Sequence, residues 1–349
     1  MNEEARIVMP PVNIARSESF FSGLTRLLFT LFISCLSLTC FAQHFEQNPA
    51  DYYSFEPVFK QSYIVSHHIK AIKASLVYKR DNQQIEDKGL SKSWEYDSTG
   101  LLRRYYATSV RGFTTREIIH PSQRRGRRIS PAYTSQEQIF NYDTSFVYFH
   151  YNSQKQIIIR RARDGDYYNS VYYEYDAAGN IKRQSVFRET NANGNSSVFR
   201  LGVQTLLSAE EFRYEKNNPH QLRRRHFNDE GKEYRQTVYN FDTQGRLQEE
   251  SSSFTVSWMR ASLKLVYDIN GRLTKKVYTS NENGEETSSS DYTYTAGNLV
   301  DVERRYKGEV LNFELNYIYD RQNSMLLSHF VREHLNKAIL IARYEYDYF

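Results

Sequence analysis

The sequence predicts an all-β protein: an antiparallel meander of repeated β-hairpins that forms either a curled sheet or a closed up-and-down barrel of about 16–20 strands. Composition is the first observation behind this prediction, since the 349 residues include 29 Tyr and 21 Phe but only 2 Trp. Tyrosine favours the pleated, half-buried surface of a strand. The second observation is a short aromatic phrase that recurs along the chain with a period of about 26 residues, which is room for two strands and two turns.

Composition also excludes several classes of protein. With 40% hydrophobic and 25% charged residues, the chain is neither a disordered tail nor a multi-span helical membrane protein. The formal charge of +5 is mild for this length and argues neither for nor against polyanion binding. Both Cys precede residue 41, inside the predicted leader, so the mature chain has no disulfide scaffold, thiolate metal site or Cys nucleophile.

The first 42 residues are predicted to be a signal peptide. An apolar run from Leu27 to Phe41 follows a polar stretch with three Arg, and its length of about 15 residues suits a signal peptide better than a membrane-spanning helix. The predicted cleavage lies between Ala42 and Gln43, with Cys40 as the second small residue. An uncleaved N-terminal anchor and a lipoprotein modified at Cys40 are the alternatives. Residues 43–349 form a single all-β domain, less regular over 43–145 and regularly repeated over 146–349.

The recurring phrase consists of an aromatic residue, any residue, a second aromatic, Asp or a substitute, a short turn and an aliphatic residue. From Tyr214 onward the second aromatic recurs at steps of 27, 26, 27, 25 and 27 residues. The copies are WEYDSTGLL (94–102), FHYNSQKQI (149–157), YEYDAAGNI (173–181), FRYEKNNPHQL (212–222), YNFDTQGRL (239–247), LVYDINGRL (265–273), YTYTAGNL (292–299), YIYDRQNSM (317–325) and a truncated YEYD (344–347).

Each copy predicts the turn of a hairpin. Two aromatics spaced by one residue share a strand face, the Asp hydrogen-bonds forward to the turn backbone, and the Gly supplies a left-handed conformation, as in a type I turn with a Gly bulge. The second aromatic is then expected opposite the aliphatic residue six positions later. The predicted structural residues are Tyr96, Asp97, Gly100, Tyr175, Asp176, Gly179, Phe241, Asp242, Gly245, Tyr267, Asp268, Gly271, Tyr294, Gly297, Tyr319 and Asp320.

Some segments depart from this spacing. Tyr294 and Leu299 are five apart, which predicts a two-residue Ala296-Gly297 turn, and Tyr214 and Leu222 are eight apart, which predicts a wider loop. The polar stretches 191–197, 226–233 and 279–286 are predicted to be the turns at the other ends of the hairpins. Residues 64–79 are predicted to be strand, and FNYDTS (140–145) is interpreted as the remnant of a degraded copy.

The phrases resemble the YD or Rhs repeat, whose pattern is close to YxYDxxGRL; YNFDTQGRL and LVYDINGRL match it almost residue for residue. The resemblance covers about residues 94–349. It implies long antiparallel sheets, which in large toxins curl into a shell around a cargo, and it implies carbohydrate binding. The chain is far too short for such a shell. It also resembles small exported bacterial proteins whose YD-like hairpins close into a porin-like barrel.

Candidate sites are few. The tyrosines are either a platform for sugar rings or simple packing against cross-strand Leu and Ile. The basic run Arg124, Arg125, Arg127 and Arg128, between Pro121 and Pro131, is either an anion-binding loop or a solvated one. The acidic turns 164–166 and 281–286 lack the full ligand spacing of a Ca²⁺ cage. On adjacent positions of a strand, His67 and His68 would face opposite ways and share no metal.

No catalytic motif is present, so the sequence predicts a protein that is not an enzyme and has no cofactor. The leading hypothesis is an exported envelope or surface protein that binds a glycan or a cell-surface protein, in the periplasm, outer membrane or cell surface of a Gram-negative bacterium. An outer-membrane barrel that passes or holds a ligand and a scaffold fragment of an Rhs-type toxin-delivery system are the alternatives. Nucleic acid is not an expected partner, because no binding motif accompanies the charge.

Overall fold

The structure is a computed structural model that describes residues 45–46, 55–120, 123–125, 128–130, 133–194, 199–282 and 284–349. All of these belong to one compact unit, Gln43–Phe349. The predicted signal peptide (1–42) and the cleavage between Ala42 and Gln43 lie outside the described residues and stay predictions. In the described part of the chain, no helix is long and apolar enough to cross a membrane.

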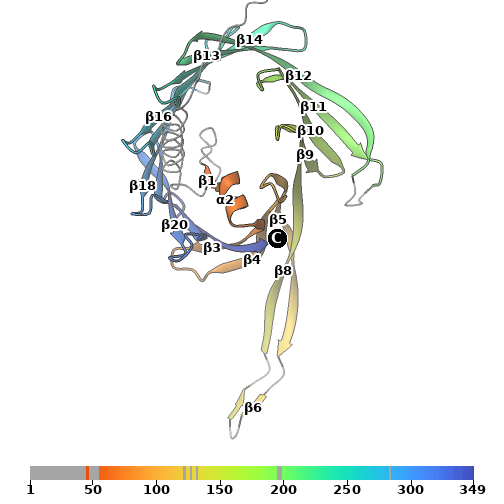
Figure 1. The fold of residues 1–349 in the computed structure, drawn as a ribbon. Coiled ribbons are helices and arrows are strands. Elements are labelled where there is room, and N and C mark those ends of the chain that lie inside the picture. Colours follow the sequence, from red (N-terminus) through yellow and green to blue (C-terminus); the bar gives the residue numbers. More distant parts are fainter. Residues whose placement is uncertain are drawn as a thin grey trace, which may run out of the picture. The chain divides into compact units, whose positions relative to one another are not determined.

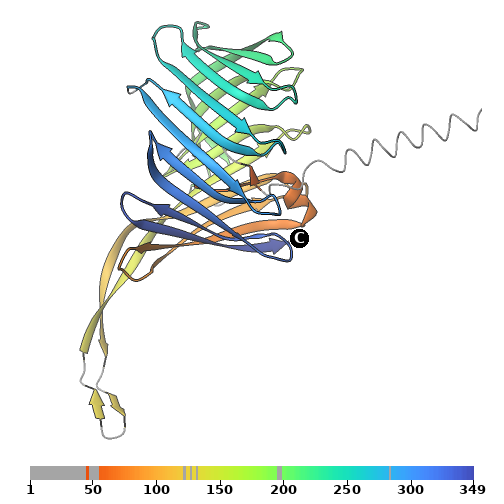
Figure 2. The same cartoon turned by 90° about the vertical axis from the view of Figure 1, so that its left-hand side faces the viewer.

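Eighteen strands of this described part form a closed antiparallel barrel (Figures 1 and 2), which confirms the predicted fold class. Almost every strand pairs with the strand that follows it in the chain, as expected of a meander of hairpins. The barrel strands are β3 (Ile69–Arg80), β4 (Glu86–Tyr96), β5 (Leu102–His120), β8 (Tyr133–Tyr151), β9 (Ile157–Asp164), β10 (Tyr167–Tyr175), β11 (Ile181–Asn191), β12 (Leu201–Asn218), β13 (Gln221–Phe227), β14 (Glu233–Phe241), β15 (Leu247–Phe254), β16 (Arg260–Tyr267), β17 (Leu273–Ser280), β18 (Glu286–Tyr294), β19 (Val300–Lys307), β20 (Val310–Tyr319), β21 (Leu326–Glu333) and β22 (Ala338–Tyr348).

The choice between open sheet and closed barrel is decided by the first and last strands. Strand β22 pairs with β3 in a long antiparallel ladder, with Ala338 opposite Arg80 at one end and Tyr348 opposite Ile69 at the other. Closure gives both strands a partner on each side, so neither presents a free edge that would invite aggregation.

The two faces of the barrel wall have different chemistry. The short helix α2 (Gln61–Ser66) lies within the ring of strands (Figure 1). Its side chains belong to the same core cluster as Ile72, Trp94 and Tyr344, so these residues face the lumen. Residues directly opposite each other on neighbouring strands share a face, and the register therefore carries this assignment around the barrel. The aromatic pair of each motif faces inward, and the residues between them face outward.

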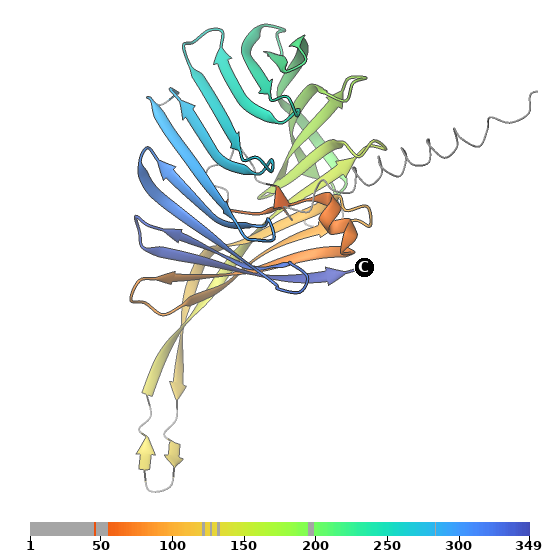
Figure 3. The same ribbon diagram turned by 60° about the vertical axis from the view of Figure 1, so that its left-hand side comes forward.

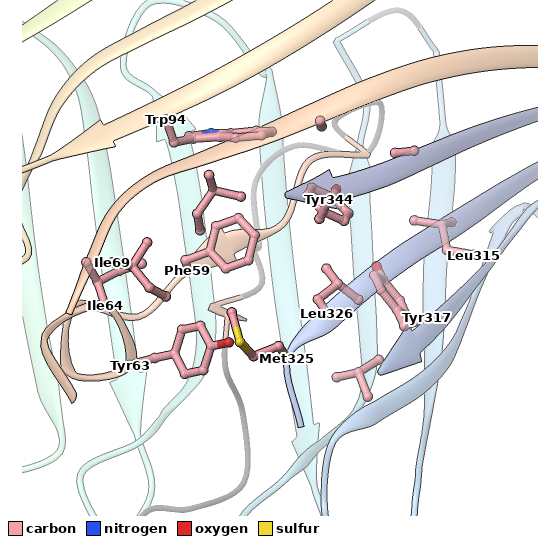
Figure 4. Packing of buried hydrophobic residues seen from close by; sticks show 14 of the residues in the cluster. Phe59, Tyr63, Ile64, Ile69, Trp94, Leu315, Tyr317, Met325, Leu326 and Tyr344 are labelled. Atoms are coloured by element: carbon pink, nitrogen blue, oxygen red, sulfur yellow. The ribbon is translucent and has the colours of Figure 1, made fainter. Parts of the chain in front are cut away.

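The N-terminal segment fills one side of the lumen. Strand β1 (Phe45–Glu46) pairs with β2 (Val58–Phe59), and α2 follows. The Phe59 ring meets Trp94 and Tyr344 edge-on, with ring centroids 6.0 and 6.1 Å away. Figure 4 shows Phe59 beside both of these rings, and Tyr63 beside Met325. The hydrophobic core is therefore a cluster between this segment and strands β3, β4 and β18–β22.

The prediction that residues 64–79 are strand is wrong for its first part. Helix α2 continues to Ser66, His67 caps it, and His68 adopts a left-handed φ of 52° before β3 starts at Ile69. Tyr63 and Ile64 are both buried. A strand would turn one of two adjacent side chains away from the core, whereas a helical turn buries both. His67 and His68 are therefore turn residues, not strand residues.

The predicted register holds for most motifs. Tyr96, Tyr151, Tyr175, Phe241 and Tyr267 each lie opposite the residue six positions later, with a bulge beside the pair.

Three predicted pairs are wrong. Tyr294 lies opposite Val300 rather than Leu299, so this hairpin has the common spacing of six and no two-residue turn. Tyr319 lies opposite Leu326 rather than Met325, because its turn is one residue longer. Tyr214 lies opposite Arg224, and the strands continue past the motif until Leu222 pairs with Lys216. Pairing beyond the motif tyrosine thus replaces the expected wide loop.

Strands β5 and β8 extend beyond the barrel as a two-stranded ribbon (Figures 2 and 3). They pair with each other from Arg104/Tyr148 to His120/Tyr133, whereas the β4 ladder ends at Ala107 of β5 and the β9 ladder ends at Val147 of β8. Residues 140–145, interpreted as the remnant of a degraded copy, lie inside β8 and form no turn. Asp143 has no turn to cap, since the strand continues through it.

Truncating Phe59 tests the luminal packing. Phe59→Ala is expected to lower the free energy of unfolding by about 3 kcal/mol, because a buried ring and its contacts with Trp94 and Tyr344 are lost. Urea unfolding followed by tryptophan fluorescence measures this. The matched control is Val65→Ala in the same segment, whose side chain is 43% exposed. Equal, small effects of the two substitutions would show that the segment does not pack in the lumen.

Candidate functional site

The motif aspartates organise the hairpin turns, as the sequence predicts. Oδ1 of Asp268 accepts the backbone N–H of Asn270 at 2.9 Å and of Arg272 at 2.8 Å. The backbone closes the same turn, since Asp268 N–H donates to the Arg272 carbonyl and Gly271 N–H donates to the Asp268 carbonyl, both at 2.9 Å. The same bonds recur at Asp97, Asp176 and Asp242, and Asp320 caps a turn that is one residue longer.

The predicted glycine role holds at four of five positions. Gly100, Gly179, Gly245 and Gly271 have φ between 76° and 85°. The prediction for Gly297 is wrong, because Asn298 takes the left-handed conformation in that turn, with φ of 63°. Asparagine tolerates this region better than most residues, so a shift of one position restores the common hairpin spacing.

Arginine after the glycine connects neighbouring hairpins. Nε of Arg272 donates to Asp268 at 2.6 Å, and its guanidinium lies 4.8 Å from the ring centroid of Tyr294 in the next hairpin. Arg246 repeats this arrangement with Asp242 at 2.6 Å and with the Tyr267 ring at 4.7 Å. The GR of the motif thus links each turn to the next through a charge-assisted bond and a cation–π contact.

A second link was not predicted from the sequence. Seven motif tyrosines donate their hydroxyl to the backbone carbonyl of the first residue of a strand in the preceding hairpin, at 2.6–3.1 Å. Phe241 has no hydroxyl and cannot make this bond. The donor–acceptor pairs are Tyr151–Leu102, Tyr175–Ile157, Tyr214–Ile181, Tyr267–Leu247, Tyr294–Leu273, Tyr319–Val300 and Tyr346–Leu326. The motif tyrosines therefore connect neighbouring hairpins of the barrel wall, which favours the packing interpretation over a platform for sugar rings.

The basic run is only partly described. Arg124 and Arg125 lie in β6 (Gln123–Arg125) and Arg128 lies in β7 (Arg128–Ser130), and these strands pair with each other. Arg127 lies outside the described residues. The flanking backbone is thus a hairpin rather than an irregular loop, and anion binding by these four residues stays a prediction.

Of the acidic turns, 164–166 is described in full, and 281–286 is described except for residue 283. Asp164 accepts a bond of 3.0 Å from the Asn169 side chain. Among the residues that the structure describes, no group of three or more His, Cys, Asp or Glu could hold a metal ion.

Among the described residues, two polar clusters on luminal positions contain a carboxylate. Glu303 accepts from Arg305 Nε at 2.8 Å and from the Tyr292 hydroxyl at 3.1 Å, and both members of this ion pair are nearly fully buried. In the second cluster, Glu210 pairs with Nδ1 of His226. Nε2 of His226 lies 3.1 Å from the hydroxyl of Thr237, which is fully buried. A carboxylate, an imidazole and a hydroxyl are therefore arranged in the order of a catalytic triad, but the hydroxyl is fully buried and a substrate cannot reach it.

The outer face carries a polar groove of about 530 Å³ over strands β14–β17. Its floor is a cross-strand row of small residues, in which Val238, Ser251, Ser262 and Thr279 are opposite one another in turn. These positions alternate with inward residues such as Tyr239 and Leu263, so they face out.

An exposed tryptophan lies beside this groove. Trp258, in the turn between β15 and β16, is 79% exposed. Its carbonyl accepts the side-chain amide of Asn281 at 3.1 Å, and Asn281 lines the groove. Sequence reasoning missed this site. The available signal was that one of only two Trp falls in a polar turn after the Ser-rich strand 247–254.

Three solved structures are similar to this chain at identities of 10–13% and TM-scores of 0.24–0.36. A porin-like protein from Bacteroides uniformis is similar over 80% of this chain and 96% of its own, with 10% identity and a TM-score of 0.36. A porin-like protein from Bacteroides vulgatus is similar over 59% of this chain and 94% of its own, with 10% identity and a TM-score of 0.26. The Photorhabdus luminescens Tc holotoxin pore is similar over 74% of this chain and 16% of its own, with 13% identity and a TM-score of 0.24. No protein-family model matches the chain, and no curated protein matches its sequence.

Removing one aspartate tests the turn. Asp268→Ala is expected to lower the free energy of unfolding by about 1–2 kcal/mol, because two backbone N–H groups and Arg272 lose their acceptor. Urea unfolding measures the change. The matched control is Asp229→Ala, since Asp229 is an exposed second residue in the turn that Asn228 caps. A loss no larger than that of the control would contradict the capping role.

Acid is expected to weaken the same turns. Side-chain and backbone N–H donors of Asn180 lower the pKa of Asp176. Burial alone would raise the pKa of Asp268, but the Arg272 backbone and side chain outweigh it and lower that pKa. A carboxylate with a lowered folded-state pKa stabilises the fold above its unfolded pKa of about 3.9, and this stability is lost as pH falls through the folded pKa.

The urea concentration at the unfolding midpoint should therefore decrease as the pH is lowered below about 4. The double variant Asp176→Asn with Asp268→Asn should show a smaller decrease over the same pH range. An unchanged slope in the double variant would contradict this account.

Proposed function

We propose that the protein is an exported, non-catalytic barrel of the bacterial envelope that is surrounded by water and binds a glycan in the outer groove beside Trp258. The observation that carries the proposal is the charge on the outer wall. The choice of a water-surrounded barrel over a lipid-embedded one depends on that wall, and the choice of ligand depends on the groove.

Oppositely charged residues pair across neighbouring strands on the outer face. Lys73 of β3 lies 2.7 Å from Asp347 of β22, Lys275 lies 3.3 Å from Asp291, and Arg304 lies 2.9 Å from Glu314. Glu95 pairs in the same way with Arg104. These side chains are about one quarter to one half exposed, and they lie on strands β3–β5, β17–β20 and β22.

Such a wall is unsuited to lipid. A membrane barrel needs an outward apolar band about 25 Å tall, and Lys or Arg at its midplane costs about 2–4 kcal/mol each. Charge pairs on the outer wall interrupt any such band. In water each pair contributes at most about 1 kcal/mol, and its partly exposed side chains lose less hydration than they would in lipid.

The groove offers the chemistry of sugar recognition. Ser251, Ser253 and Ser262 supply hydroxyls, and Gln236 and Asn281 supply amides, so hydrogen bonds can be donated and accepted along the floor. The exposed indole of Trp258 provides an aromatic face against which a sugar ring can stack.

A solubility experiment tests the barrel's surroundings. Residues 43–349 are expressed and purified without detergent. The expected result is a folded, monodisperse protein in the absence of detergent. As a second measurement, its migration in SDS gels before and after heating is compared with that of a porin. A barrel that remains folded only in detergent micelles would overturn the proposal and favour the outer-membrane alternative.

A glycan array tests the ligand. The folded protein is expected to bind a subset of glycans, and Trp258→Ala is expected to reduce that signal at least tenfold while leaving the unfolding midpoint unchanged, since the side chain is exposed. Leu335→Ala, at an 82% exposed position in another turn, is the matched control. Background signal from well-folded protein would overturn glycan binding and leave the water-surrounded barrel intact.

A further inference from the structure

The lumen contains a small cavity of about 120 Å³ that the outer groove does not involve. The rings of Trp94 and Tyr344 and the side chains of Glu56, Lys92 and His329 line it. Its volume corresponds to about four water molecules, at about 30 Å³ each. It lies between the N-terminal segment and the strands that close the barrel, beside the core cluster.

His329 brings an unpartnered donor to this cavity. The imidazole is 3% exposed, and its Nε2 has no hydrogen-bond partner within the described part of the chain. Nδ1 lies 2.8 Å from the Tyr344 hydroxyl. Burial raises the pKa of Tyr344, so this hydroxyl keeps its proton. It donates to Nδ1, and the imidazole proton is therefore on Nε2. A buried N–H without an acceptor is costly and rare.

The electrostatic surroundings of His329 keep its imidazole neutral. Burial, then the nearby cations Lys92 and Arg305, lower the pKa of His329 to about 3. Both cations already have a carboxylate partner, since Lys92 pairs with Glu56 and Arg305 pairs with Glu303. Nζ of Lys92 lies 2.5 Å from Glu56, whose Oε1 also accepts from the Tyr105 hydroxyl at 2.8 Å. Lys92 has three donors and can contact a second carboxylate.

A larger hollow of about 520 Å³ adjoins this polar end and shares Leu76, Lys92 and Leu340 with the cavity. Leu90 and Tyr78 continue its apolar lining, and the rest of the lining is mostly polar, with Arg80 and Glu333 among its charged residues. The two spaces together present the Nε2–H donor and the Lys92 ammonium beside three leucines, Leu76, Leu90 and Leu340.

We infer that this luminal space binds a monocarboxylate with an apolar tail. The carboxylate accepts from Nε2–H of His329 and contacts Lys92, and the tail lies along Leu76, Leu90 and Leu340. A small mostly apolar pocket with a few convergent polar groups is the usual form of such a site. The inference is independent of the glycan groove, because no residue lines both.

Tryptophan fluorescence tests this inference with octanoate as the probe. The chain has two Trp, and Trp258→Phe leaves Trp94, which lines the cavity, as the reporter. In that background, octanoate is expected to change the Trp94 emission saturably, with a Kd below about 1 mM. Octanol, which has the same tail and no carboxylate, is expected to bind at least tenfold more weakly.

Two variants of His329 and one control refine the test. His329→Phe is expected to weaken octanoate at least tenfold, and His329→Gln, which keeps an N–H donor, is expected to lose less. His334→Phe, at an exposed histidine just after β21, should bind octanoate as well as the parent protein. No saturable change with octanoate, equal binding of octanol, or full affinity in a folded His329→Phe variant would each overturn the inference. The comparison of octanoate with octanol decides the matter even if the variants fail to fold. The glycan array gives an independent result, so failure here is distinguishable from failure of the groove.

Discussion

The bonds from each motif aspartate to two backbone N–H groups of its turn are the constraint on which the barrel depends. They fix how many residues separate the paired strands, and this number decides which side chains face inward. With Asp268 bound to Asn270 and Arg272, Tyr267 lies opposite Leu273 and both face the lumen. A slip by one residue would turn Tyr267 outward and separate its hydroxyl from the Leu247 carbonyl. Turn chemistry, strand register and the bonds between hairpins therefore support one another.

The same register gives the wall two chemically distinct faces. Inward positions carry the motif aromatics, the core cluster around the N-terminal segment and a few buried charges, such as Glu303 with Arg305. Outward positions carry partly exposed charge pairs and the hydroxyl-rich groove. A porin-type barrel in lipid places its apolar band outside, whereas this wall places its largest apolar cluster inside. This inversion supports the proposal of a barrel in water, and it places the cavity beside His329 on the apolar side of the wall.

Much of the fold is local enough to be predicted from sequence. Each hairpin turn is encoded within about nine residues, so the strand order, the Asp and Gly roles and most registers follow from the motif alone. The wrong predictions occur where a neighbouring residue can take the same role in a turn, or where strand pairing or packing overrides the local sequence pattern. Asn298 replaces Gly297 as the left-handed residue, and pairing continues past Tyr214. Likewise, Tyr63 and Ile64 are buried together in a helical turn because both side chains pack inside the lumen.

The sites could not be predicted in the same way, because their residues come from distant strands. His329, Lys92 and Glu56 meet only because the barrel closes and the N-terminal segment enters it. The tyrosine hydroxyl bonds span 18 to 49 residues of sequence and depend on the neighbouring hairpin. Barrel closure is thus the condition for the luminal cavity, whereas the outer groove needs only the neighbouring strands β14–β17.

Closure can be tested directly with a disulfide. Residues 43–349 contain no Cys, and Ser75 of β3 lies opposite Arg343 of β22. Ser75→Cys with Arg343→Cys is expected to give a monomeric, folded protein with one intramolecular disulfide on mild oxidation, detected by mass and by gel mobility. Free thiols in a folded protein, or cross-links only between molecules, would contradict the closed barrel.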